Sequence, residues 1–495
     1  MQFRIFFVII LVFLFPATNA ELSSEKKDIQ LIGNIKKDKK SRLKTEYKII
    51  KLKDLESILI NNSEQLKKYK SQIEQSKLIL KSKIAAWAPK ATISSSSIPS
   101  YETGYSENKI SSDSETNQLK FGLDTKIEWD LIQPKRRLEI KIAKSKIENA
   151  KVQYNAIFKD LYLDSVKKYL AIQASIQEIK VAEKAIEISN TSLKDAENRL
   201  SKGVGNKLDV LESRTQLRRD QINLINKNNN LKFNKNQLSE ILNINEEFNI
   251  ENKKTNLIEF YWDLNFQESL YYFMENSESI NISKRNIKIN KDEASLILSS
   301  KKPIFTIYNK YSLTSIDGES GVPPLNLGNE INNYNNTVGL KFNWNIFDGG
   351  RIKQDFLSKK KRKKELESDL NLKKNKVIRE LKDTFNEYRD IKEKIILSYE
   401  QLQAAKESLF ISTKRVEAGI STQREIVNTQ GDLIEAETNL INSIKEYKII
   451  LAKFYRITSI KPKAFCSINA SKDQKEKGFY DFLKNKNLVS KCNEV

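Results

Sequence analysis

The side chains that most often carry chemistry in proteins are nearly missing from this chain. Its 495 residues include no histidine and only two cysteines, Cys466 and Cys492, so the commonest metal ligand and general base are absent. In an oxidising compartment the two cysteines could close a loop of about 27 residues, or they could stay free thiols. Gly203-Val204-Gly205 is too short for a phosphate-binding loop. We therefore expect no catalytic residue, no cofactor and no metal site.

The strong positive charge is the second feature that could indicate a partner. A formal charge of +22 would suit binding to nucleic acid. However, lysine, asparagine and isoleucine are abundant throughout, and the lysines mostly alternate with glutamate and aspartate. The charge therefore follows from the general composition, and we expect no nucleic-acid partner.

The N-terminus has the features of a secretory signal. Arg4 precedes an apolar run from Ile5 to Phe15, and Thr18-Asn19-Ala20 offers a small-residue cleavage site. The run is about 11 residues long, whereas a membrane-spanning helix needs about 20. An uncleaved anchor is the alternative. We predict that residues 1–20 are a signal peptide and that any membrane span of the exported chain is built from strands.

Further along, the chain repeats one long pattern. Residues 126–134 align with residues 341–349, and Gly203 and Gly419 follow at matching distances. A period of about 215 residues is far longer than a solenoid unit and indicates a duplicated half-protein.

Each half contains segments with the alternation of a strand. Apolar residues alternate with polar ones in residues 121–131, 304–314 and 337–346, as in strands that face lipid on one side and water on the other. A half-buried sheet of a soluble protein would give the same pattern. Residues 90–100 alternate only weakly, and residues 102–119 are interpreted as a polar loop.

Each half also contains a very long tract without helix breakers. Residues 135–202 contain no glycine or proline, which permits a helix of roughly 100 Å. Apolar residues recur every seven positions, which predicts packing against a neighbouring helix. This seam consists of Ile172, Ile179, Ile186, Leu193 and Leu200 in the first half, and of Leu381, Tyr388, Ile395, Leu402, Leu409 and Val416 in the second.

Gly203 and Gly419 are expected to adopt left-handed conformations where each long helix reverses its direction. Returning helices are expected at about residues 208–244 and 424–454, so each half is a strand pair that leads into a helical hairpin. The predicted organisation is a signal peptide (1–20), a basic polar linker (21–50), a first repeat (51–245), an inter-repeat linker (246–262), a second repeat (263–458) and a C-terminal periplasmic tail (459–495).

Three segments give the chain a resemblance to a known family. They are residues 343–351 (NWNIFDGGR), which lead into a long helix, and the two hairpin tips at residues 199–210 and 415–427. From about residue 51 to 458, the chain resembles the TolC-like outer membrane efflux protein family. The resemblance implies a mainly α fold with membrane β-strands. A homotrimer would combine a 12-stranded outer-membrane β-barrel, four strands per subunit, with a long periplasmic α-helical barrel.

The resemblance also implies roles for particular residues. Glu425 matches an acidic ring at the channel entrance, and Asn428 stands where a second acidic residue often sits. Asp209 matches a residue of a gating latch. The usual tyrosine and arginine partners of that residue are replaced here by Val416 and Ser421. Trp87, Trp129 and Trp344 are expected at the membrane interface, with core packing as the alternative. The tips would dock an adaptor through Arg199, Leu200, Gly203, Val204, Leu208, Arg415, Val416, Gly419, Ile420 and Thr422.

The function expected from these features is a passive exit duct for efflux or type I secretion. It would sit in the outer membrane, extend into the periplasm, contact outer-membrane lipid, and work with a periplasmic adaptor (membrane fusion) protein and an inner-membrane pump. An autonomous porin-like pore would not need adaptor-docking tips or rods of roughly 100 Å. An exported coiled-coil scaffold would leave the alternating strands unexplained. An enzyme is not expected.

Overall fold

The computed structural model describes residues 48–107, 109–110, 112–251, 260–321 and 330–464. The chain divides into residues 1–48 and residues 49–495, and every helix described below belongs to the second unit.

Several predicted features fall beyond these ranges. The signal peptide (1–20), most of the basic polar linker (21–50), and both Cys466 and Cys492 lie outside the described residues.

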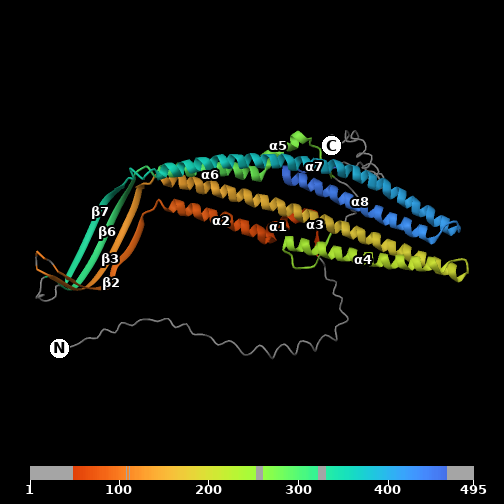
Figure 1. Cartoon of the computed structure of the whole chain (residues 1–495), viewed down its shortest axis with the longest axis horizontal. Coiled ribbons are helices and arrows are strands. Elements are labelled where there is room, and N and C mark those ends of the chain that lie inside the picture. Colours follow the sequence, from red (N-terminus) through yellow and green to blue (C-terminus); the bar gives the residue numbers. More distant parts are fainter. Residues whose placement is uncertain (1–47, 108, 111, 252–259, 322–329, 465–495) are drawn as a thin grey trace, which may run out of the picture. The chain divides into compact units, whose positions relative to one another are not determined.

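Two copies of one series of elements follow each other along the chain (Figure 1). The long helices α3 and α7 have 67 residues each, and the returning helices α4 and α8 have 36 each, so the predicted duplication is confirmed. The first copy comprises a 3-10 turn (Leu52–Asp54), α1 (Leu55–Asn62), α2 (Glu64–Ala85), β2 (Lys90–Ser106), β3 (Ser114–Ile132), α3 (Lys135–Ser201) and α4 (Lys207–Leu242). The second comprises α5 (Phe266–Asn276), α6 (Glu278–Ser299), β6 (Ile304–Gly321), β7 (Ile331–Asn343), α7 (Arg351–Glu417) and α8 (Gln423–Thr458).

The two strand pairs form one antiparallel sheet in the order β2-β3-β6-β7. Residues paired across neighbouring strands share a face of the sheet. Leu123, Leu313 and Tyr334 form one such apolar row, and the next residues along the strands form a polar row of Asp124, Ser312 and Asn335. The predicted two-faced alternation is therefore confirmed.

The strands are longer than the sequence suggested. Residues 102–119, expected as a polar loop, lie mostly in β2 and β3, and only residues 107–113 connect the two strands. Both faces are polar here, so no alternation reveals the strands. In addition to the backbone pairing, hydrogen bonds between polar side chains link neighbouring strands here, as between Thr116 and Ser320 at 3.0 Å.

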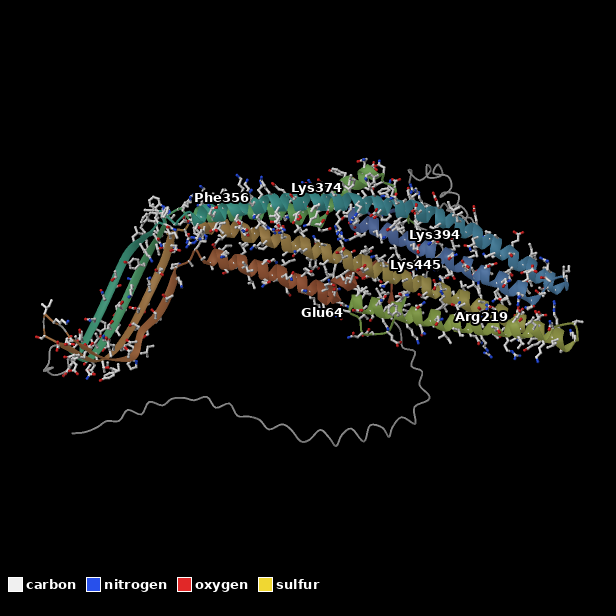
Figure 2. The ribbon with its side chains drawn as sticks, viewed as in Figure 1. Glu64, Arg219, Phe356, Lys374, Lys394 and Lys445 are labelled. Carbon is white, nitrogen blue, oxygen red and sulfur yellow. The ribbon has the colours of Figure 1, made fainter. Side chains whose placement is uncertain are left out.

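The helices form a layer with α3 in an inner position. Helices α2 and α4 pack on one side of α3, and α6 and α8 pack on its other side and against α7. The order across the layer is thus α2-α3-α6-α7 near the sheet and α4-α3-α8-α7 near the hairpin tips. Figure 2 shows charged side chains such as Arg219 on α4 and Lys394 on α7 along the helices. None of the described helices is long and apolar enough to cross a bilayer.

The seven-residue seam was predicted correctly in α7 but not in α3. In α7, Leu381, Tyr388, Ile395, Leu402 and Val416 are buried, and Leu409 is half-buried. In α3 only Ile172 of the predicted set is fully buried; Ile179, Ile186 and Leu193 are half-buried and Leu200 is exposed. Beyond Ile172 the buried residues of α3 are all alanine or serine, because this part of α3 packs between α4 and α8 and small side chains let helices approach closely. They include Ser175, Ala182, Ser189 and Ala196.

Each repeat has its own hydrophobic core. The first lies where α1 and the start of α2 pack on α3 and α4, and the second lies where α5 and the start of α6 pack on α7 and α8. The first contains Leu59, Tyr169 and Leu238, and the second contains Trp262 stacked on Phe454 with ring centroids 4.5 Å apart. Short strands close both cores and lie in segments interpreted as linkers or tail. β1 (Lys48–Ile50) pairs with β4 (Phe248–Ile250), and β5 (Phe260–Tyr261) pairs with β8 (Lys463–Ala464).

Candidate functional site

The two hairpin tips have the same backbone geometry. Gly203 and Gly419 have φ of +73° and +74°, as predicted for left-handed turns. The amide of Val204 donates to the carbonyl of Arg199 at 3.1 Å, and the amide of Ile420 donates to that of Arg415 at 2.9 Å. These contacts satisfy carbonyls at the ends of α3 and α7 and turn the chain sharply.

The tips expose apolar side chains to solvent. Val204 is 77% and Ile420 is 72% exposed. Leu200 and Leu208 are also exposed, as is Thr422, which precedes α8. Exposed apolar residues this close together favour contact with another protein.

The first tip contacts the second through Arg199. Its guanidinium donates to the carbonyl of Val416, a residue that is 3% exposed. Gln423, at the start of α8, donates to the hydroxyl of Ser192 on α3 at 2.7 Å. The structure therefore brings the two predicted tip segments together.

Glu425, the predicted entrance carboxylate, is engaged within its own hairpin. Its carboxylate accepts from Arg415 at 3.0 Å and from the hydroxyl of Ser421. Asn428 is exposed one turn further along α8. In this arrangement the negative charge of Glu425 is balanced by Arg415, a contact that the sequence reasoning missed.

Asp209 has no hydrogen-bonding partner among the described residues; it lies half-buried in the first turn of α4. A different pair links α8 to the first hairpin. Both Nε and Nη2 of Arg424 donate to Oε1 of Glu212 on α4, at 3.1 and 2.6 Å. The sequence offered no signal for this contact, because 212 residues separate its partners.

A groove of about 360 Å³ lies between the hairpins just inside the tips. Its floor includes the apolar side chains of Ile188, Leu409 and Ile426, and its rim carries charged groups such as Asp195 and Glu417. A groove with this lining suits an amphipathic partner segment.

A buried polar cluster lies further from the tips. Asp220 of α4 is 4% exposed and contacts Ser189 of α3 and Gln430 of α8, which are each 1% exposed. Burial raises the pKa of the Asp220 carboxyl above its usual value. This cluster was not predicted from the sequence.

Trp129 and Trp344 occupy equivalent places in the two repeats, near the end of β3 and just after β7, and Trp87 lies between α2 and β2. Nε1 of Trp129 donates to the carbonyl of Trp87, and Nε1 of Trp344 donates to that of Lys301, both at 2.9 Å. Trp87, Trp129 and Trp344 are 44%, 43% and 49% exposed, so they do not pack in the core of the single chain.

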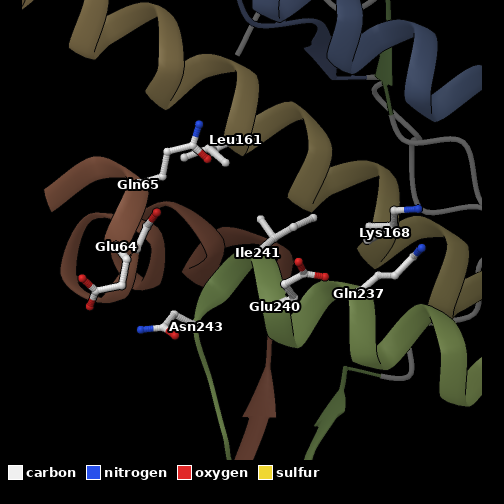
Figure 3. Close-up of a pocket in the computed structure, with 9 residues that line it drawn as sticks. Glu64, Gln65, Leu161, Lys168, Gln237, Glu240, Ile241 and Asn243 are labelled. Atoms are coloured by element: carbon white, nitrogen blue, oxygen red, sulfur yellow. The ribbon is translucent and has the colours of Figure 1, made fainter. Parts of the chain in front are cut away.

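A second cavity, of about 350 Å³, lies where α2 begins beside α3 and the end of α4 (Figure 3). Its lining is mostly polar and includes Glu64, Lys168 and Glu240. In the described part of the chain, acidic side chains and cysteines do not gather in groups of three that could hold a metal ion.

The family model of the outer membrane efflux protein matches residues 57–243 and 309–459. These segments cover most of both repeats, and the chain belongs to this family. No curated protein matches the chain.

Several solved structures have the same fold. The chain is similar to a membrane protein from Pseudomonas aeruginosa (14% identity, TM-score 0.66, covering 83% of this chain and 91% of that one). It is also similar to the outer membrane protein VceC from Vibrio cholerae (14%, 0.62, 82% and 96%) and to the CmeC outer membrane channel of Campylobacter jejuni (15%, 0.61, 88% and 89%).

Proposed function

We propose that three copies of this chain form an outer-membrane exit duct of a tripartite efflux or type I secretion system. The observation that carries the proposal is that, among the described residues, both the sheet and the helix layer end on edges without a further strand or helix beside them. The sheet ends at β2 and β7, and the helix layer ends at α2 and α4 on one side and at α7 on the other.

The sheet edges favour closure with further copies. Four strands are too few to enclose a pore, and edge strands expose unpaired backbone groups. Pairing β7 of one copy with β2 of the next would give twelve strands in three copies. The apolar face would then meet lipid, and Trp87, Trp129 and Trp344 would lie at the membrane interface.

The helix edges also favour this closure. On α4, Leu211 and Ile225 are 48% and 60% exposed, and on α7, Leu397 and Ile411 are 64% and 49% exposed. Each pair is two heptads apart, so each forms one apolar stripe. α4 runs away from its tip and α7 runs toward its own. Packed side by side, they would bring Leu211 to Ile411 and Ile225 to Leu397 of the next copy.

The tips would form the periplasmic entrance. Their exposed apolar residues and the neighbouring groove support docking of an adaptor's helical hairpin. Opening would move α8 away from α3 and α4, which requires Arg424 to leave Glu212. The inner-membrane pump would supply the energy, and the duct itself would be passive.

Cysteine cross-linking tests the α4–α7 seam directly. In a chain with Cys466 and Cys492 changed to serine, we expect Leu211→Cys with Ile411→Cys to give covalent dimers and trimers after oxidation. Ile225→Cys with Leu397→Cys should do the same.

The matched control combines Leu211→Cys with Leu397→Cys. These positions lie on the same two faces but about 21 Å out of register, so no cross-link is expected. If neither in-register pair gave covalent oligomers, or if the control linked equally well, the proposed seam would be wrong.

A further inference from the structure

Asp220 is an acidic side chain buried where three helices from both hairpins meet. Its carboxylate accepts hydrogen bonds from Ser189 of α3, from Gln216 of its own helix at 3.0 Å, and from Gln430 of α8 at 3.2 Å. The same Nε2 atom of Gln430 lies 2.8 Å from Oγ of Ser189 and 3.0 Å from the carbonyl oxygen of Ala185, so its two N–H groups are shared among three acceptors. The side chain of Asp220 thus lies at the contact between α8 and the first hairpin.

Among the described residues, no cation forms an ion pair with this buried carboxylate. The groups that hydrogen-bond to Asp220 from α3, α4 and α8 are Ser189, Gln216 and Gln430, which are all neutral. The cations next to it in sequence, Arg218 and Arg219, are exposed on α4; Arg218 donates to Gln221 at 2.8 Å, and Arg424 of α8 contacts Glu212. Three neutral donors only partly replace the water that a carboxylate loses on burial.

We propose that Asp220 is a proton-sensitive lock on the duct, which holds α8 in the closed arrangement when protonated and weakens that hold when ionised. The inference rests on the proposed opening motion of α8. In the closed state Asp220 is buried, and in the open state the departure of α8 would hydrate it.

The sign of the effect follows from linkage. Burial raises the pKa of Asp220 in the closed state, and hydration would return it toward its ordinary value, so the closed state binds the proton more tightly. Acidification therefore favours closure, and a rise in pH through the closed-state pKa favours opening. Each unit of difference between the two pKa values changes the closed-to-open ratio by about tenfold.

The test is the single-channel open probability of the full chain in planar bilayers, measured as the pH is lowered from neutral toward the ordinary pKa of a carboxyl group. The wild type should close progressively on acidification. Asp220→Asn should lose most of this pH dependence. Asp164→Asn, which removes an exposed carboxylate of α3 that contacts Lys167, should behave like the wild type.

A second variant separates the lock from a merely structural role. Gln430→Met removes the donor from α8 and leaves the carboxyl in place, so it should raise the open probability at neutral pH and keep the pH dependence. An unchanged pH dependence in Asp220→Asn would overturn the proposed role of Asp220 but leave the proposed function of the channel standing. A wild type that forms no conducting channel would overturn the proposed function and the lock with it.

Discussion

At the residue scale, the ion pairs close to the tips are exposed and individually weak. Arg424, which links α8 to Glu212 of the first hairpin, is more than half exposed, and so is Arg415, which meets Glu425 within the second hairpin. Exposed ion pairs typically contribute about 0.2–1 kcal/mol. Such contacts could hold a gate closed and still release it when a partner docks.

We predict that Arg424→Ala raises the open probability of the channel in bilayers by up to about fivefold, the equivalent of one exposed ion pair. Glu212→Ala should have the same effect, and the double variant should add little because both remove one interaction. Arg389→Ala, which removes an exposed arginine from α7, serves as the control. Fully additive effects would show that the two residues act separately.

The tip turns were predictable from the sequence, whereas the contacts between hairpins were not. A glycine after a long breaker-free helix is a local signal, and it placed Gly203 and Gly419 correctly. Asp220 and Gln430 are 210 residues apart. Their contact depends on how two hairpins pack, which local periodicity does not specify.

At the scale of elements, the apolar pattern predicted the buried face of a helix or strand only where that face is lined by apolar residues. The seam of α7 follows its apolar heptads, whereas α3 is packed on both sides and buries small residues that carry no strong hydrophobic signal. The polar ends of β2 and β3 were misread for a similar reason, since neither face there is apolar. Pattern reasoning fails where burial or pairing does not require apolar residues.

Two glycines near the second tip give opposite predictions for stability. Gly419 has φ of +74°, so Gly419→Ala should lower the free energy of unfolding by roughly 1 kcal/mol. Gly431 lies inside α8, and an added Cβ would meet nothing within 4 Å. Gly431→Ala should therefore stabilise by about 0.5–1 kcal/mol. Thermal unfolding of the two variants should give shifts of opposite sign; a stabilised Gly419→Ala variant would contradict the assigned turn, and a destabilised Gly431→Ala variant would contradict the open space beside Gly431.

At the scale of the whole molecule, one chain forms a four-stranded sheet and a layer of helices, and neither closes on itself to form a pore. In the part of the chain that the structure describes, the sheet has two free edges, and the outer helices carry apolar stripes that no other described element covers. The sequence indicated the duplication and the long rods, but the edges became visible only in the order of strands and helices. A duct therefore forms only if further copies of the chain close these edges.

The most direct test of this closure is electron microscopy of the detergent-extracted protein. We expect particles with three-fold symmetry, a long stem and a stain-filled axial channel. Thin rods, or compact particles without a central channel, would contradict the duct and favour an exported scaffold.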